Sequence, residues 1–87
     1  MTNKFTVIIS GKPEKNLKKI PFPWSMRILD ALTTLEVDPY TGEKMWGEYE
    51  GTRKIRIWPY RVIYIVDEKE HCVKVVEIGH RGSMGYK

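Results

Sequence analysis

The stretch that decides the fold is RKIRIWPYRVIY, residues 53–64. It alternates cationic with aliphatic side chains, reaches a Trp-Pro pair, and then presents another cation followed by further aliphatic residues. This pattern is typical of two strands joined by a tight turn, each with one buried face. Three of its cations, Lys54, Arg56 and Arg61, are therefore crowded onto one hairpin within a chain of only 87 residues.

The length of the turn decides which side chains share a face. An even number of turn residues places the aliphatic residues of both strands on one face and Arg61 with Arg56 on the other, whereas an odd number reverses the second strand. Pro59 and Tyr60 suit the two central positions of a two-residue turn, which sets Trp58 opposite Arg61. We therefore expect the cations to converge on one face of the sheet.

Such a gathering of cations is not explained by folding. Like charges on adjacent strands cost about 0.2 to 1 kcal/mol for each close pair. Any one of these cations, taken alone, is best interpreted as a long, solvated side chain on the open face of a half-exposed sheet. For the three together we favour a functional site, because sequences break local rules of this kind mainly at such sites.

The same face also carries apolar residues. By strict alternation Ile63 and Ile65 point the same way as Arg61. The sequence ends at Lys87, too soon after the last expected strand to supply a C-terminal helix as a cover. We therefore expect a partner protein to cover these isoleucines.

The rest of the chain completes an α+β domain. We expect strands at residues 4–10, 53–58, 60–66 and 72–78, helices at residues 13–20 and from residues 23–25 to 36, and a loop at residues 39–52. The order strand, helix, helix, strand, strand, strand predicts two N-terminal helices packed on one face of a small antiparallel β-sheet. A length of 87 residues fits one domain, residues 1–87.

Composition excludes several classes of protein. The longest apolar run is a few residues and no signal-peptide pattern is present, so we expect a cytoplasmic protein without membrane contact. Cys72 is the one cysteine and cannot form an internal disulfide, and His71 lacks a second ligand at metal spacing. His80 invites assignment as a general base, but a lone histidine at a strand end is more often structural. The net charge of +4 is mild for a nucleic-acid binder, so the placement of the cations matters more than their sum.

Residues 35–67 read LEVDPYTGEKMWGEYEGTRKIRIWPYRVIYIVD, and VEIGHR follows at residues 76–81. This resembles the RelE branch of the RelE/ParE toxin superfamily, which has a loop of DP-x-x-G-x-K-x-x-G type, a basic strand, YR-x-x-Y and a closing I-x-HR. The motifs span roughly half the chain, and the order of elements is similar along nearly all of it.

The resemblance implies a RelE-like fold and a toxin of a toxin–antitoxin pair. Such a toxin enters the ribosomal decoding site and cuts messenger RNA there, without a metal or cofactor. The reaction is similar to that of other metal-independent ribonucleases, in which the ribose 2′-hydroxyl attacks its own phosphate and leaves a cyclic phosphate and a free 5′-hydroxyl. The implied partners are the ribosome, messenger RNA and a RelB-like antitoxin.

The family positions match five catalytic candidates here: Lys54, Arg56, Arg61, Arg81 and Tyr86. The resemblance implies that Arg61 and Arg56 hold the phosphate, that Arg81 assists the leaving oxygen, and that Lys54 or Tyr86 accepts the 2′-hydroxyl proton. Arg56 stands where the best-known members have lysine. Because arginine is a poor base, the proton acceptor must be one of the other two.

The remaining expectations concern binding. Arg53, Trp58 and His80 are the candidates for contact with RNA, with Trp58 either stacking on a base or serving as a plain turn aromatic. An acidic, partly disordered antitoxin would fold as helices over Ile63 and Ile65.

Two other functions remain open. One is a ParE-like toxin that inhibits gyrase without cleavage, although the predicted first helix is short and is interrupted at residues 21–23, where that branch resembles a longer helical hairpin. The other is a non-toxic, basic RNA-binding module.

Overall fold

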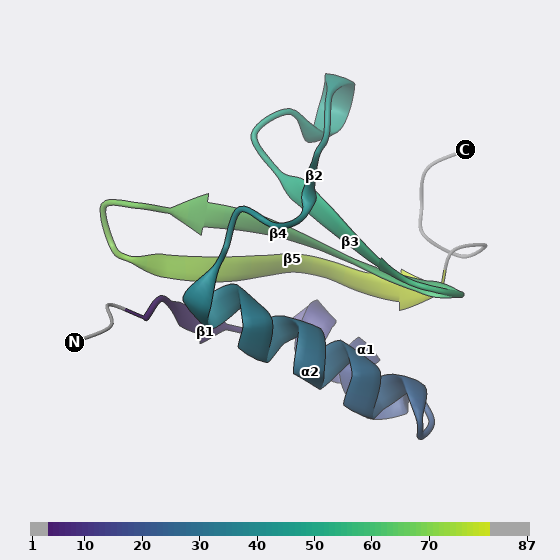
Figure 1. Cartoon of the computed structure of the whole chain (residues 1–87). Helices are drawn as coiled ribbons and strands as arrows, with labels where there is room; N and C mark the ends of the chain where they lie inside the picture. The colour runs from purple at the N-terminus through teal and green to yellow at the C-terminus, as the bar shows by residue number, and fades with distance from the viewer. Residues whose placement is uncertain (1–3, 81–87) are drawn as a thin grey trace.

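The computed structural model describes residues 4–80. Two helices cover one face of a five-stranded sheet, which confirms the predicted α+β fold (Figure 1). The elements are β1 Thr6–Ile8, α1 Lys12–Lys19, α2 Trp24–Val37, β2 Glu43–Lys44, a 3-10 helix η1 at Gly47–Tyr49, β3 Arg53–Ile57, β4 Tyr60–Asp67 and β5 Cys72–His80.

The strand order is β1-β5-β4-β3-β2. The pairs β2–β3, β3–β4 and β4–β5 are antiparallel, but β1 runs parallel to β5. The sheet is therefore mixed, and the prediction of a wholly antiparallel sheet is wrong in this respect. The two helices carry the chain from β1 across the sheet, and the meander then returns β5 to lie beside β1 in the same direction. β2 was not predicted, because it lies inside the segment expected to be a loop.

The core lies between the helices and one sheet face. Ile28, Leu32 and Leu35 recur at spacings of four and three along α2, and all three are buried. Their partners on the sheet are Val62, Tyr64, Val73, Val75 and Ile78. Each fully buried aliphatic side chain contributes roughly 1.5 to 3 kcal/mol, so this stripe fixes α2 on the sheet.

The β3–β4 turn contains two residues, as predicted, but it sits one position earlier. Ile57 pairs with Tyr60 and Arg56 with Arg61, so Trp58 and Pro59 are the central residues. The predicted pairing of Trp58 with Arg61 is therefore wrong. Pro59 takes the second central position, where β-turns carry proline after a cis bond, as here.

A bulge in β5 changes which residues face the core. Ile63 pairs with Glu77 and Tyr64 with Val75, which leaves Val76 as the extra residue. The side chain of Ile78 therefore faces the helices and that of Glu77 faces the open side. The sequence left open a bulge at Gly79, and the structure places it three residues earlier.

The open face of the sheet is partly covered by the chain itself. Ile63 is 0% exposed, so the expectation that it lies open for a partner is wrong. It lies between its ladder partners Lys54 and Glu77, and the Tyr49 hydroxyl reaches across from η1 to donate to Glu77 Oε1 at 3.4 Å. Ile65, further along β4, remains 38% exposed.

Candidate functional site

Three cations meet on the open face at the turn end of the β3–β4 hairpin. Arg56 and Arg61 are direct ladder partners, and Lys54 lies two residues before Arg56 on the same face of β3. The Arg56 side chain is 70% exposed, whereas that of Lys54 is only 13% exposed. The predicted convergence is therefore present, and we call Lys54, Arg56 and Arg61 the cation cluster.

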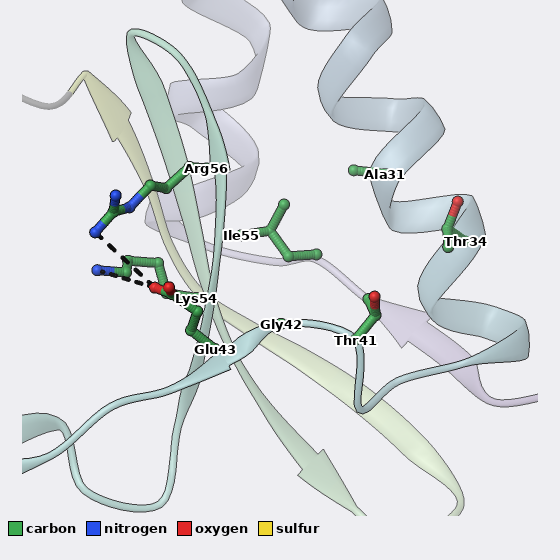
Figure 2. Close-up of a pocket in the computed structure, with 8 residues that line it drawn as sticks. All are labelled: Ala31, Thr34, Thr41, Gly42, Glu43, Lys54, Ile55 and Arg56. Atoms are coloured by element: carbon green, nitrogen blue, oxygen red, sulfur yellow. Dashed lines mark ion pairs between the residues drawn. The ribbon is translucent and has the colours of Figure 1, made fainter.

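Glu43 approaches this cluster from β2, opposite Lys54 in the ladder. Its Oε1 lies 3.7 Å from Lys54 Nζ and 3.9 Å from Arg56 Nη2, the two ion pairs drawn in Figure 2. The Glu43 side chain is 66% exposed, and ion pairs with such a solvated partner contribute only about 0 to 1 kcal/mol. A phosphate can therefore displace the carboxylate at little cost.

Tyr49 and Glu77 form a second pair on the same face. The carboxylate of Glu77 raises the pKa of Tyr49, and the nearby positive charge of Arg61 opposes that effect. The phenol therefore stays protonated at neutral pH, able to donate a hydrogen bond to an oxygen or to stack on a base.

Sequence reasoning missed Glu43, Tyr49 and Glu77. Glu43 and Tyr49 lie in the segment predicted to be a loop, where no alternating pattern fixes a face. The facing of Glu77 depends on the bulge at Val76, which has no glycine or proline to mark it.

Buried Tyr64 holds the loop that leads into β2. Its hydroxyl donates to the Pro39 carbonyl oxygen at 2.8 Å and accepts from the Gly42 N–H at 3.0 Å. Burial raises the pKa of Tyr64, which favours the neutral phenol that can make both bonds. This anchor fixes the position of Glu43, the next residue along the chain.

Two of the predicted RNA contacts lie away from the cation cluster. Arg53 Nη1 donates to the carbonyl oxygens of Tyr40 and Gly42 at 3.1 and 2.9 Å, and its guanidinium lies 5.2 Å from the Tyr40 ring centroid. The His80 ring packs edge-on against Tyr60, at 5.4 Å between centroids, on the helix-covered side of the sheet. Both residues therefore make contacts within the fold.

The other candidates are placed as follows. Trp58 is 67% exposed in the turn beside Arg56 and Arg61. Arg81 and Tyr86 lie outside the described residues.

Between residues 4 and 80 there is no group of three or more His, Cys, Asp or Glu side chains that could hold a metal ion. Cys72 is buried with a free thiol. No helix in this part of the chain is long and apolar enough to span a membrane.

A family model described as the ParE toxin of type II toxin–antitoxin system, parDE, matches residues 7–84. The chain therefore belongs to this family, within the RelE/ParE superfamily, and is a type II toxin. No curated protein matches it in sequence.

Solved structures agree on the fold. The archaeal RelE–RelB complex from Pyrococcus horikoshii contains a chain 27% identical, with a TM-score of 0.78 over 93% of this chain and 99% of that one. The RelBE2 toxin–antitoxin complex of Mycobacterium tuberculosis gives 24% identity and a TM-score of 0.81, over 90% and 99%. The isolated Escherichia coli RelE toxin is 19% identical, with a TM-score of 0.78 over 87% of this chain and 83% of that one.

Proposed function

We propose that this toxin is a ribosome-dependent endoribonuclease that cuts messenger RNA in the ribosomal A site. The observation that carries the proposal is the direct pairing of Arg56 with Arg61, with Lys54 beside them, on a rigid two-strand scaffold. Two guanidinium groups on directly paired residues suit a phosphate, since each can form a bidentate, charge-assisted contact with its oxygens.

The proposed reaction is an internal transesterification. The ribose 2′-oxygen forms a bond to phosphorus, the bond from phosphorus to the 5′-oxygen breaks, and the products are a 2′,3′-cyclic phosphate and a 5′-hydroxyl. Arg56 and Arg61 stabilise the negative charge that develops on the phosphate oxygens. Arg81 assists the departing 5′-oxygen.

A base must also take the proton of the 2′-hydroxyl. Lys54 and Tyr86 remain the candidates from the sequence, and Glu43 becomes a third, because its carboxylate lies 3.7 Å from Lys54 Nζ within the same cluster. Trp58 offers an exposed indole on which a base can stack beside the scissile phosphate. Arg53 and His80 support this surface indirectly, through the loop and the turn that they pack against.

The test is primer extension on a defined message in a translation extract, with and without ribosomes. The toxin should produce breaks inside codons only when ribosomes are present, and Arg61→Ala should abolish them. Arg27→Ala is the matched control, since Arg27 is exposed on α2 and lies on the helix side of the molecule. If the messenger RNA stays intact at toxin concentrations that stop protein synthesis, the proposal is contradicted.

The natural partner is an acidic antitoxin of RelB type. Two of the similar structures are complexes with a RelB protein. This chain has a group of exposed apolar residues on the open face of its sheet, where an antitoxin can bind. Ile8 and Ile65 flank Lys74 on either side, and Val76 follows it on β5; these isoleucines and the valine are 38–42% exposed. An amphipathic helix with acidic edges fits this group. Ile65→Asp should weaken copurification with a coexpressed RelB-type antitoxin, and unchanged copurification would place the contact elsewhere.

Gyrase inhibition is the second candidate, because the matching family model carries the ParE name. Against it, α1 has only 8 residues and is followed by the Pro-Phe-Pro segment before α2. A DNA supercoiling assay with purified gyrase separates the two functions.

A further inference from the structure

Half of β3 has an open edge. β3 pairs with β4 along all of its residues, but β2 covers only Arg53 and Lys54 on the other side. Residue pairs in an antiparallel ladder alternate between hydrogen-bonded and non-hydrogen-bonded, and the pair that closes a two-residue turn, Ile57 with Tyr60, is hydrogen-bonded. The main-chain N–H and C=O of Arg56 therefore point away from β4, to a side where no strand of residues 4–80 pairs with them.

A groove runs beside this open edge, between β3 and α2. Figure 2 shows Ile55 pointing from β3 towards Ala31 and Thr34 of α2, with Thr41 closing one end. The cavity has a volume of about 360 Å³, at the lower end of the range for ligand sites. Ala31 and Ile55 make the part of its lining between α2 and β3 apolar, and this part suits small apolar side chains, whereas Glu43, Lys54 and Arg56 make its other side charged.

The two sides of the edge differ in charge. Ile55 faces the groove, whereas Lys54 and Arg56 face the open side, where they attract Glu43 (Figure 2). A strand added to this edge inherits the alternation of β3. The residue beside Arg56 then faces the cations, and the next residue enters the groove.

We propose that this edge binds an extended acidic segment of the antitoxin as an added strand. The partner itself rests on the proposed function. The segment places an Asp or Glu beside Arg56, on the side where Lys54 also lies, and alternates it with small apolar residues placed against Ile55 and Thr34. Its main chain pairs with the free groups of Arg56, as in other cases of strand addition at a sheet edge.

Charge argues against two other occupants. A second copy of this chain, paired edge to edge, brings the Lys54 and Arg56 side chains of both copies together, which costs free energy. The segment that follows β5, RGSMGYK at residues 81–87, contains two cations and no acidic residue. An acidic partner gains free energy at the same positions.

Strand addition here would inhibit the toxin directly. An added carboxylate beside Arg56 would compete with Glu43, and with a substrate phosphate, for the Arg56 and Lys54 side chains. The open-face contact around Ile65 and this edge contact are separate, because they lie at different positions along the sheet.

The test uses the full chain and a synthetic peptide of about nine residues that alternates glutamate and valine. Hydrogen exchange followed by NMR should show that the amide of Arg56 slows markedly when the peptide binds. The same peptide with N-methyl groups on alternate residues cannot pair with the edge, and should lose at least about tenfold in affinity. Absence of binding at millimolar peptide, or protection that appears at β1 instead of Arg56, would overturn the inference.

The chain offers a closely matched pair of variants. Thr33 and Thr34 are adjacent exposed residues of α2, and each hydroxyl donates to the carbonyl oxygen four residues earlier. Only Thr34 lines the groove. Thr34→Phe should weaken peptide binding by about tenfold or more, while Thr33→Phe should stay within about twofold of the wild type. Equal effects in both variants would overturn the inference, and the N-methyl peptide tests it even if Thr34→Phe fails to fold.

This outcome is separable from the proposed function. Neither threonine belongs to the cation cluster, so both variants should cut messenger RNA when no peptide is present. A wild-type protein that binds the peptide at Arg56 but cuts no messenger RNA would support the edge site and contradict the proposed nuclease function.

Discussion

Replacement of Gly42 by alanine should destabilise the whole domain, although Gly42 lies in the loop before β2 and not in a helix or strand. A Cβ at this position would lie 2.5 Å from Tyr64 Oη and 2.9 Å from the Lys54 carbonyl oxygen. Gly42 is not among the glycines with a positive φ, so the backbone itself accepts alanine. The cost is therefore steric.

Neither neighbour of Gly42 can move cheaply. Tyr64 is 0% exposed and is held by both of its hydrogen bonds, and the Lys54 carbonyl belongs to the backbone of β3. The loop must lift instead, which breaks the contacts of the Tyr64 hydroxyl with Gly42 N at 3.0 Å and with Pro39 O at 2.8 Å. A buried polar group without a partner costs roughly 1 to 3 kcal/mol, so the expected loss is about 2 to 4 kcal/mol. This corresponds to a fall in Tm of roughly 10 to 30 °C for a domain of this size.

The assay is urea and thermal unfolding followed by circular dichroism, for Gly42→Ala, Tyr64→Phe and the double variant. Tyr64→Phe removes the 2.5 Å contact but leaves the one with Lys54 O. The double variant should therefore be more stable than the sum of the single losses predicts, by about 1 kcal/mol. Gly47→Ala is the control, since nothing lies near its Cβ and the φ of 71° alone should cost about 1 to 2 kcal/mol. A Gly42→Ala protein within about 0.5 kcal/mol of the wild type, or strictly additive losses, would refute the reasoning.

Three further predictions concern the cluster, the charge network and the core. Arg61→Ala should reduce messenger RNA cleavage by roughly 10²-fold or more with no change in the far-ultraviolet circular dichroism spectrum, as measured by single-turnover cleavage on programmed ribosomes. A hydrogen bond from the Glu70 N–H, together with the Lys74 ammonium, holds the pKa of Asp67 below its ordinary value of 3.8. The charged carboxylate therefore stabilises the fold above pH 3.8, and this contribution disappears as the pH falls through the lower pKa of the folded state. Asp67→Asn should accordingly lower the Tm at pH 7, and the difference from wild type should shrink in acid; a constant difference would contradict this. Leu35→Ala should cost about 2 to 5 kcal/mol in urea unfolding because Leu35 is fully buried, and a smaller loss would mean that the core collapses around the cavity.

The elements that the sequence predicts well are those set by local patterns. The apolar spacing of Ile28, Leu32 and Leu35 specifies α2 and its buried face without reference to any other segment. The alternation on both sides of the Trp-Pro pair likewise specifies the hairpin, and an even turn suffices to bring Arg56 and Arg61 to one face. Lys54 shares the face of Arg56 by alternation, so all three members of the cation cluster follow from the hairpin pattern alone.

The features that the sequence does not predict depend on contacts between distant residues. β2 forms because Tyr64, more than 20 positions away, anchors Gly42. Ile63 is buried because the Tyr49 loop folds back over β4 and β5, a contact that alternation within one strand cannot indicate. The extra residue at Val76 reverses the facing of Glu77, and it is visible only in the pairing of β4 with β5.

The most direct test of the central claim is the chemistry of the cut ends. Purified ribosomes carrying a defined message, incubated with the toxin, should release fragments that end in a 2′,3′-cyclic phosphate and begin with a 5′-hydroxyl, cut within the A-site codon. Arg56→Ala and Arg61→Ala should each suppress these ends. An uncut message on toxin-bound ribosomes, or fragments that begin with a 5′-phosphate, would contradict the proposal that the cation cluster supports 2′-hydroxyl attack.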